Sequence, residues 1–106
     1  MHYSPGDGVF HAIADPNRRR LIDLLAEGEK SVQELAEGFD ITVAAVSQHL
    51  AVLRDSRLVS RRARGRQRLY RLDAAPLRVV DEWTSRHRRF WQSRMKRLHA
   101  YLDKGL

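Results

Sequence analysis

The sequence contains no cysteine, and this absence excludes several kinds of protein at once. Without thiols there is no disulfide framework, no thiolate ligand for a soft metal ion and no cysteine nucleophile. We therefore expect a reducing, cytoplasmic location. No apolar run approaches the ~20 residues of a membrane-spanning helix. The first residues, Met1-His2-Tyr3-Ser4-Pro5, lack the apolar core of a signal peptide.

Acidic residues are also scarce, because 13 Asp and Glu face 20 Lys and Arg, a net charge of +7. Such an excess favours a polyanionic partner, although charge alone does not distinguish DNA, RNA, acidic lipid and acidic protein. The chain has no glycine-rich phosphate loop and no Ser/His/Asp set with recognisable spacing. We expect neither an enzyme nor a bound cofactor. With 106 residues, the chain has room for one domain, residues 1–106.

Helix-capping residues divide the first half of the chain into four short helices. Each of the last three follows a side chain that caps helix N-termini well: Asp15, Ser31 and Thr42. Pro16 suits the first turn of a helix, and Glu34 stands at capping-box distance from Ser31. The predicted helices cover about 7–14, 16–28, 31–38 and 42–54.

The fourth helix has one apolar side and one small, uncharged side. Its apolar stripe, which we expect to face the core, consists of Val43, Val46, Leu50 and Leu53. The helical period then turns other residues outward or to the flanks: Ala44, Gln48 and Ala51, with Ala45 and Ser47 beside them. A helix that enters the major groove needs such small residues for close approach. Gln48 can bond adenine through two hydrogen bonds, Ser47 can reach bases or phosphate, and Thr42 at the positive helix end suits a phosphate. The alternative is an ordinary amphipathic helix with an alanine-rich exposed face.

Strand-like residues surround a glycine turn over 58–72, which predicts a β-hairpin. The hairpin carries five arginines within eight residues and no acidic residue: Arg61, Arg62, Arg64, Arg66 and Arg68. Phosphate is a natural counter-ion for such a cluster. We expect Arg64 and Arg66 at the tip to enter a minor groove, and Arg62 and Arg68 to contact the DNA backbone. Two short helices followed by a basic hairpin give the order of a winged helix-turn-helix.

The last segment, 74–104, is predicted to form one long helix. Its apolar residues recur at helical spacing and need a partner surface: Val80, Trp83, His87, Phe90, Trp91, Leu98, Tyr101 and Leu102. A second copy of the helix is the simplest partner. The aromatic residues could instead line a ligand pocket between subunits, but a dimer core is the commoner use of such a stripe.

Several of these segments together resemble the ArsR/SmtB family of bacterial regulators. The resemblance covers nearly the whole chain and rests on 15–21, 31–36, 46–53, Leu58-Val59, 64–66 and 70–72. It implies a dimeric winged-helix repressor whose terminal helices form the dimer interface, which adds Val9 and Phe10 of the first helix. It also places Ala44, Ala45, Ser47 and Gln48 where the family reads DNA.

The chain departs from the family's pattern at its metal sites. Leu35-Ala36-Glu37-Gly38 stands where metal sensors often carry Cys-x-Cys, and neither Asp81-Glu82-Trp83 nor His99 with Leu102 matches the family's second site. We therefore expect no metal site. Arg57 occupies a position where the family commonly has glycine, so the turn after the fourth helix is expected to differ. His49 lies beside the apolar stripe and is expected to pack or to form a hydrogen bond.

These observations predict a mainly α protein with a β-hairpin, a winged helix-turn-helix that is dimeric through its terminal helices. Residues 7–73 would form the DNA-binding core, with the wing at 58–72 and the dimerisation helix at 74–104. We expect a homodimeric regulator, in particular a repressor or autorepressor, that binds an inverted repeat of double-stranded DNA in a promoter and has no membrane partner. The alternative is a basic RNA-binding or protein-interaction module that uses the hairpin and the long helix. The sequence leaves open whether an effector controls DNA release.

Overall fold

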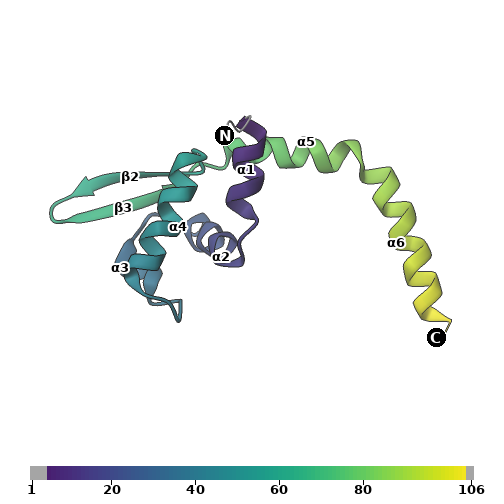
Figure 1. Cartoon of the computed structure of the whole chain (residues 1–106), viewed down its shortest axis with the longest axis horizontal. Helices are drawn as coiled ribbons and strands as arrows, with labels where there is room; N and C mark the ends of the chain where they lie inside the picture. The colour runs from purple at the N-terminus through teal and green to yellow at the C-terminus, as the bar shows by residue number, and fades with distance from the viewer. Residues whose placement is uncertain (1–4, 105–106) are drawn as a thin grey trace.

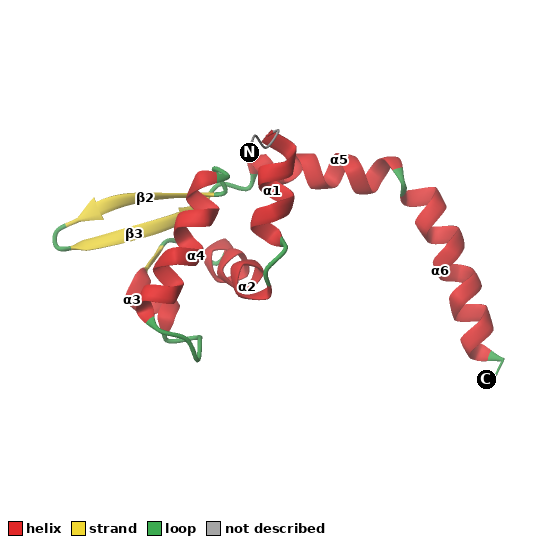
Figure 2. Cartoon of the chain, in the orientation of Figure 1, coloured by secondary structure: helices red, strands yellow, loops and turns green. Residues whose placement is uncertain are grey.

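The computed structural model describes residues 5–104, with side chains from residue 8 onward. The elements, in chain order, are α1 (Pro5–Ile13), α2 (Pro16–Ala26), β1 (Lys30–Ser31), α3 (Val32–Ala36), α4 (Val43–Asp55), β2 (Val59–Arg64), β3 (Gln67–Leu72), the 3₁₀ turn η1 (Ala75–Leu77), α5 (Arg78–Arg86) and α6 (Arg88–Asp103). Helices α1 to α4 form a body from which the β2–β3 hairpin projects on one side, and α6 extends away on the other (Figures 1 and 2). This mainly helical architecture with a hairpin confirms the predicted fold class.

The three predicted caps all form. Asp15 accepts hydrogen bonds from the amides of Asn17 and Arg18, at 2.8 and 3.1 Å, and so caps α2. Ser31 and Glu34 exchange hydrogen bonds in both directions, which completes a capping box at α3. These caps satisfy amides that would otherwise lack partners at the helix starts, and they fix where α2 and α3 begin.

The hairpin belongs to a three-stranded antiparallel sheet of order β1-β3-β2. The hairpin matches the prediction, whereas β1 was not expected. In β1, Lys30 pairs with Tyr70 and Ser31 with Leu69. This short strand joins the base of the hairpin to the segment between α2 and α3, so the wing is anchored through β3.

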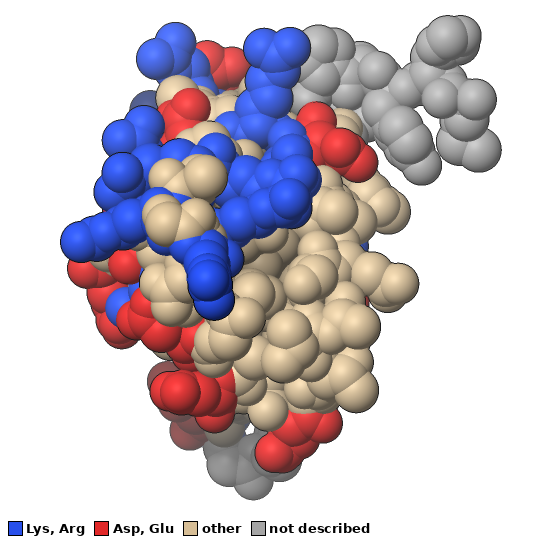
Figure 3. Space-filling view, turned by 90° about the vertical axis from the view of Figure 1, so that its left-hand side faces the viewer, with Lys and Arg blue, Asp and Glu red and all other residues tan. Residues whose placement is uncertain are grey.

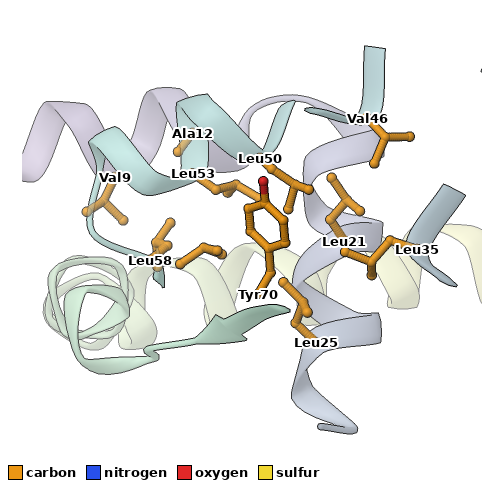
Figure 4. Packing of buried hydrophobic residues seen from close by; sticks show 11 residues of the cluster. Val9, Ala12, Leu21, Leu25, Leu35, Val46, Leu50, Leu53, Leu58 and Tyr70 are labelled. Atoms are coloured by element: carbon orange, nitrogen blue, oxygen red, sulfur yellow. The ribbon is translucent and has the colours of Figure 1, made fainter. Parts of the chain in front are cut away.

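The core lies where α1, α2, α3, α4 and the base of the hairpin meet. Its largest fully buried side chains include Leu21, Leu35, Leu50, Leu53 and Leu58. The ring of Tyr70 points from β3 into this cluster (Figure 4). Val9 is also part of the core, with only 3% of its surface exposed. Its predicted place in the dimer interface is therefore wrong, because its side chain packs within its own subunit.

Helix α4 ends in a Schellman motif with arginine at the left-handed position. The amide of Leu58 donates to the carbonyl of Leu53, and the amide of Arg57 donates to that of Arg54, both at 3.0 Å. Arg57 has a φ of 64°, a conformation that favours glycine. The turn thus keeps a geometry suited to glycine although an arginine occupies it.

The C-terminal segment is not the single helix that was predicted over 74–104. It consists of η1, α5 and α6, with a break at His87, whose φ of −106° and ψ of 4° leave the helical region. Neither proline nor glycine stands at the break. Instead Nδ1 of His87 lies 2.8 Å from the carbonyl oxygen of Trp83. In a continuous helix the backbone amide of His87 would donate to the carbonyl of Trp83. Here the imidazole occupies that carbonyl, and the amide donates to the carbonyl of Thr84 instead.

Helix α5 packs on α1, whereas α6 leaves the body (Figure 1). Phe10 of α1 and Trp83 of α5 form an edge-to-face pair with ring centroids 6.2 Å apart. Every residue of α6 is exposed. The radius of gyration is 17.6 Å, against about 13 Å for a compact chain of this length. Helix α6 is therefore an arm that is not packed on its own subunit.

Candidate nucleic-acid interface

Helix α4 has the predicted orientation over most of its length. Val46, Leu50 and Leu53 are fully buried, and Ala44 and Gln48 on the opposite side are exposed. Ala45 and Ser47 are half-buried on the flanks, as expected. The outward surface of the helix is therefore small and uncharged at its centre.

Val43 does not belong to the buried stripe, since 47% of its surface is exposed. It is the first residue of α4, one turn before the first buried residue of the helix, Val46. The helix start thus projects beyond the core. This places an additional apolar side chain beside the polar residues at the N-terminus of α4.

Thr42 caps α4, and its hydroxyl oxygen accepts a hydrogen bond of 3.0 Å from the amide of Ala45. A hydroxyl that accepts one bond still has its own O–H to donate. Thr42 is exposed at the positive end of the helix dipole. Its capping role therefore remains compatible with an anionic ligand.

The pairing register divides the wing, defined as β2, β3 and the turn between them, into two faces. Residues directly opposite each other on antiparallel strands share a face. Arg61 is opposite Tyr70 and Ala63 is opposite Arg68, which places these residues on the face that continues into the core. The pairs Arg62 with Leu69, Arg64 with Gln67 and Ser60 with Arg71 occupy the other face. The wing arginines thus do not form one surface.

A hollow of about 320 Å³ lies between the helix-turn-helix and the wing. Its lining comes from α3, α4 and the wing: Val32, Gln33, Ser47, Arg66, Gln67, Arg68 and Tyr70. The structure therefore brings three predicted DNA-binding residues, Ser47, Arg66 and Arg68, to one site. Gln33 and Gln67 were not predicted. Their only sequence signal is that each is an uncharged polar residue next to a predicted element boundary.

Arg62 differs from the other wing arginines because it has an acidic partner. Its Nε and Nη2 atoms donate to the two carboxylate oxygens of Glu29, each over 2.8 Å. These hydrogen bonds are the main reason that the pKa of Glu29 lies below its usual value, and the same partner raises the pKa of Arg62. The sequence argument that the hairpin lacks a counter-ion is therefore wrong for Arg62, because Glu29 stands 33 positions earlier in the chain.

The tip of the wing carries Arg64 and Arg66 on either side of Gly65, which has a φ of 61°. Both arginines are exposed. Viewed toward the tip, Lys and Arg side chains gather over one part of the surface, with uncharged surface next to them (Figure 3). Cations and uncharged surface thus lie side by side on this end of the molecule.

His49 of α4 is tied to α2, which confirms its expected packing or hydrogen-bonding role. Its Nδ1 atom is 3.4 Å from Nη1 of Arg18, and it must accept because a guanidinium only donates. Arg18 also donates to the carbonyls of Ala12 and His11, at 2.7 and 3.0 Å. One guanidinium therefore connects the end of α1 to the helix that carries Gln48.

The other predicted interface residues lie on α1, α5 and α6. Phe10, Val80 and His87 are half-buried within the subunit. The exposed ones present large apolar surfaces: Trp83, Phe90, Trp91, Leu98 and Leu102, each 40 to 55% exposed. Tyr101, which belongs to the predicted apolar stripe, is exposed as well, and so is Met95 of α6, which does not belong to it. The arm thus carries a broad apolar side that no other part of residues 5–104 covers.

Metal ligands do not gather anywhere within residues 5–104. These residues include no group of three or more histidine or carboxylate side chains placed to share a metal ion. Within the same residues, no helix is both long and apolar enough to cross a membrane.

Comparison with known proteins identifies the family. Residues 15–61 match the model of the bacterial regulatory protein, arsR family. The chain is 41% identical to the HTH-type transcriptional regulator Rv2034 of Mycobacterium tuberculosis over 78 residues, 74% of this chain and 73% of the relative. It is 34% identical to the transcriptional repressor SdpR of Bacillus subtilis, over 73% of this chain and 86% of the relative.

A solved structure agrees with these relatives. The homodimeric winged helix-turn-helix DNA-binding domain of Mb0332 from Mycobacterium bovis superimposes with a TM-score of 0.65 and 28% identity, over 79% of this chain and 81% of that one. The predicted resemblance and the prediction of a regulator rather than an enzyme are therefore confirmed. The chain belongs to the arsR family of bacterial regulatory proteins.

Proposed function

We propose that this protein is a homodimeric repressor that binds an inverted repeat in duplex DNA, with α4 of each subunit in a major groove. The observation that carries the proposal is the outward side of α4. Its exposed Ala44 and Gln48 lie opposite three fully buried apolar residues, and the arginine-bearing wing lies next to it. A helix needs this combination to approach base edges closely while cations contact the backbone.

Gln48 is the base-reading residue of the proposal. Its amide can accept from and donate to one adenine at the same time, a pairing worth about 1–3 kcal/mol of discrimination. Ala44 next to it is small enough for a thymine methyl group to approach. Specificity would therefore come from few side chains, and most of the affinity from phosphate contacts.

The hollow between α3, α4 and the wing is the proposed position of one phosphate strand. Arg66 and Arg68 supply positive charge from the wing, while Ser47 and Gln33 supply neutral donors from the helices. Such a mixture of charged and neutral donors is common where proteins hold a DNA backbone. Thr42 would contact a phosphate at the start of α4, and Arg64 at the tip would reach toward the minor groove.

Dimerisation is proposed to occur through the arm. Trp91, Leu98 and Leu102 are each about half exposed in the single chain, and large exposed apolar patches mark association sites. A second copy offers the same apolar arm together with the exposed edge of Trp83. The Mb0332 domain, to which the chain is similar, is homodimeric, which supports the formation of a dimer. The dimer would repress by occupying promoter DNA that polymerase needs.

A salt titration with duplex DNA tests the proposal. If a dimer contacts 6 to 10 phosphates, its affinity should fall by roughly 10³ to 10⁵ between 50 and 200 mM salt. Selection of bound sequences from random duplexes should then enrich an inverted repeat. Single-stranded and double-stranded RNA of the same length serve as competitors, and a clear preference for RNA would refute the proposal in favour of an RNA-binding module.

A further inference from the structure

The wing contains one arginine whose charge is neutralised within the molecule. Arg62 and Glu29 form a side-on ion pair in which both carboxylate oxygens accept, each over 2.8 Å. Arg62 shares its face with Arg64 and Arg71, and both lower the pKa of Glu29 after the larger effect of Arg62 itself. Glu29 therefore lies among the cations of this face, and both of its carboxylate oxygens accept hydrogen bonds from one of them, Arg62.

The opposite face of the wing turns toward the helix-turn-helix. Tyr70 on that face is 5% exposed and packs into the core. Arg68, which shares the face with Tyr70, lines the hollow together with Ser47 of α4. Of the arginines that line this hollow, Arg68 lies on the face that Arg62 does not occupy and Arg66 lies in the turn, whereas Arg62 does not line it.

We propose that Glu29 and Arg62 are positioning residues that hold the wing at its working angle, and that Arg62 is not a DNA ligand. The inference rests on the proposed function, because it assigns roles within the same DNA interface. It also changes the expectation from the sequence, in which Arg62 and Arg68 had the same role.

The position of Glu29 explains how the pair acts on the wing. Glu29 directly precedes Lys30, whose pairing with Tyr70 fixes the backbone at that point. Strand β1 holds only β3, because the sheet order leaves β2 on the outside. The ion pair reaches past β3 to Arg62 on β2, whose partner on β3, Leu69, is only 6% exposed. Both strands of the wing are thereby attached to the segment between α2 and α3.

Binding of Arg62 to phosphate would disrupt this arrangement without a net gain of charge contacts. The guanidinium would exchange one anion for another, and the carboxylate of Glu29 would lose its partner close to a polyanion. A bidentate pair also fixes the orientation of the planar guanidinium, which an isolated surface contact does not. The pair therefore acts through geometry more than through stability, since exposed ion pairs stabilise proteins only slightly.

The salt dependence of DNA binding separates a positioning residue from a phosphate ligand. Each phosphate contact contributes about 0.9 to the slope of log affinity against log salt concentration. We expect Arg62→Gln and Glu29→Gln each to weaken DNA binding by the dimer two- to fivefold per subunit, a loss that corresponds to the energy of an exposed ion pair. The slope of log affinity against log salt concentration should stay at the wild-type value. Arg68→Gln, the matched control on the other face, should lower the slope by about 0.9 per subunit.

A charge swap provides the second test. The double variant Glu29→Arg with Arg62→Glu keeps the net charge and can reform the pair in the opposite sense. If the pair positions the wing, the swap should recover affinity to within about twofold of wild type, although Arg62→Glu alone binds at least tenfold more weakly. A phosphate ligand could not be replaced by glutamate, so the swapped protein would then bind no better than Arg62→Glu alone.

Two results would overturn the inference: a slope lowered by about 0.9 per subunit in Arg62→Gln, or no recovery in the swap. Failure of the proposed function is distinguishable from both. In that case the wild-type protein itself would show no salt-dependent binding to duplex DNA.

Discussion

At the scale of single residues, Gln48 is the position that we propose to read the base sequence. It is the exposed polar side chain at the centre of α4. We expect Gln48→Ala to lower affinity for the selected operator by about 5- to 150-fold, the range for one bidentate base contact. Binding to random duplex should change little, because random sequences do not offer the contact. Competition binding measures the affinity for both DNAs, and Gln92→Ala on α6 is the control. If the ratio of operator affinity to random-duplex affinity were unchanged in Gln48→Ala, Gln48 would not recognise a base.

Arg57 offers a prediction about stability rather than binding. Its φ of 64° places an arginine in a left-handed turn, which costs a non-glycine residue about 1–2 kcal/mol. Glycine avoids this strain but loses more conformational entropy on folding, by roughly 0.5–1 kcal/mol. We therefore expect Arg57→Gly to raise the free energy of unfolding by about 0.5 kcal/mol, measured by urea denaturation.

The control for Arg57 is Arg57→Ala, which removes the charge but keeps the Cβ atom. Alanine should give no comparable gain, because the strain arises from Cβ in this conformation. If alanine stabilised the protein as much as glycine, loss of the arginine charge and not relief of strain would be the cause.

The capping box predicts a dependence of stability on pH. The pKa of Glu34 is lowered, first by the hydrogen bond from the backbone amide of Ser31 and then by that from its hydroxyl. A carboxylate whose pKa is lower in the folded state stabilises the protein above its unfolded pKa, about 4.3 for glutamate, and loses that contribution as the pH falls through the folded value. Asp15 acts in the same direction: burial raises its pKa, but the backbone hydrogen bonds from Arg18 and Asn17, together with the nearby His49 and Arg18 side chains, lower it by more.

Urea denaturation at pH 7 and at pH 3.5 tests the role of Glu34. Glu34→Gln keeps an oxygen acceptor for Ser31 but cannot titrate, so its loss of stability between the two pH values should be smaller than that of the wild type. Glu37→Gln, at the other end of α3, is the control. An equal loss in Glu34→Gln and wild type would show that the cap does not contribute to acid unfolding.

At the scale of elements, we propose that the wing supplies affinity without sequence preference. We expect Arg66→Ala to weaken binding to operator and random duplex by the same factor and to lower the salt slope by about 0.9 per subunit, because a phosphate contact is independent of base identity. The measurement is the salt titration on both DNAs, with Arg86→Ala on α5 as the control. A loss confined to the operator would instead place Arg66 among the base-reading residues.

Elements encoded by neighbouring residues were predictable from the sequence. Caps at Asp15, Ser31 and Thr42 act within three positions, and the wing turn at Gly65 is equally local. The orientation of α4 followed from helical periodicity, and it failed only at Val43, where the periodic pattern continues past the edge of the core. The positions of Ser47 and Gln48 on the helix therefore follow from its periodicity alone.

Features that depend on distant or competing contacts were not predictable. Strand β1 is two residues long and exists only because β3 lies beside it. The partner of Arg62 is Glu29, which no local pattern connects to the wing. The break at His87 results from competition between an imidazole and a backbone amide for one carbonyl, in a segment whose apolar spacing fits a continuous helix.

At the scale of the whole molecule, the proposed dimer makes the arm and the proposed DNA-reading helix α4 depend on each other through symmetry. One α4 reads one half-site, and two half-sites about 34 Å apart can be bound together only if two subunits are held at that spacing. The arm is exposed along its whole length in the single chain, so a substitution in the proposed dimer interface should leave the core undisturbed. This makes the role of the arm testable by a single substitution.

Leu98→Arg is the variant that tests it. Leu98 is 47% exposed in the subunit, so arginine there should leave the fold intact but place a charge in the proposed interface. We expect the variant to be monomeric by sedimentation equilibrium and to lose at least about 100-fold in affinity for an inverted repeat, because linked sites gain about 10² to 10⁴ over single ones. Affinity for an isolated half-site should stay close to that of the wild-type subunit.

The control for Leu98→Arg lies on the same helix. Arg89 stands nine residues earlier, which turns it about 180° away from Leu98, and Arg89→Ala should remain dimeric with unchanged DNA binding. If Leu98→Arg stayed dimeric, the subunits would have to associate through α1 and α5 alone, through the surface around Phe10 and Trp83. In that case the apolar side of α6 would need a different partner. If Leu98→Arg instead folds but is monomeric, the apolar side of α6 is the surface that binds the second subunit.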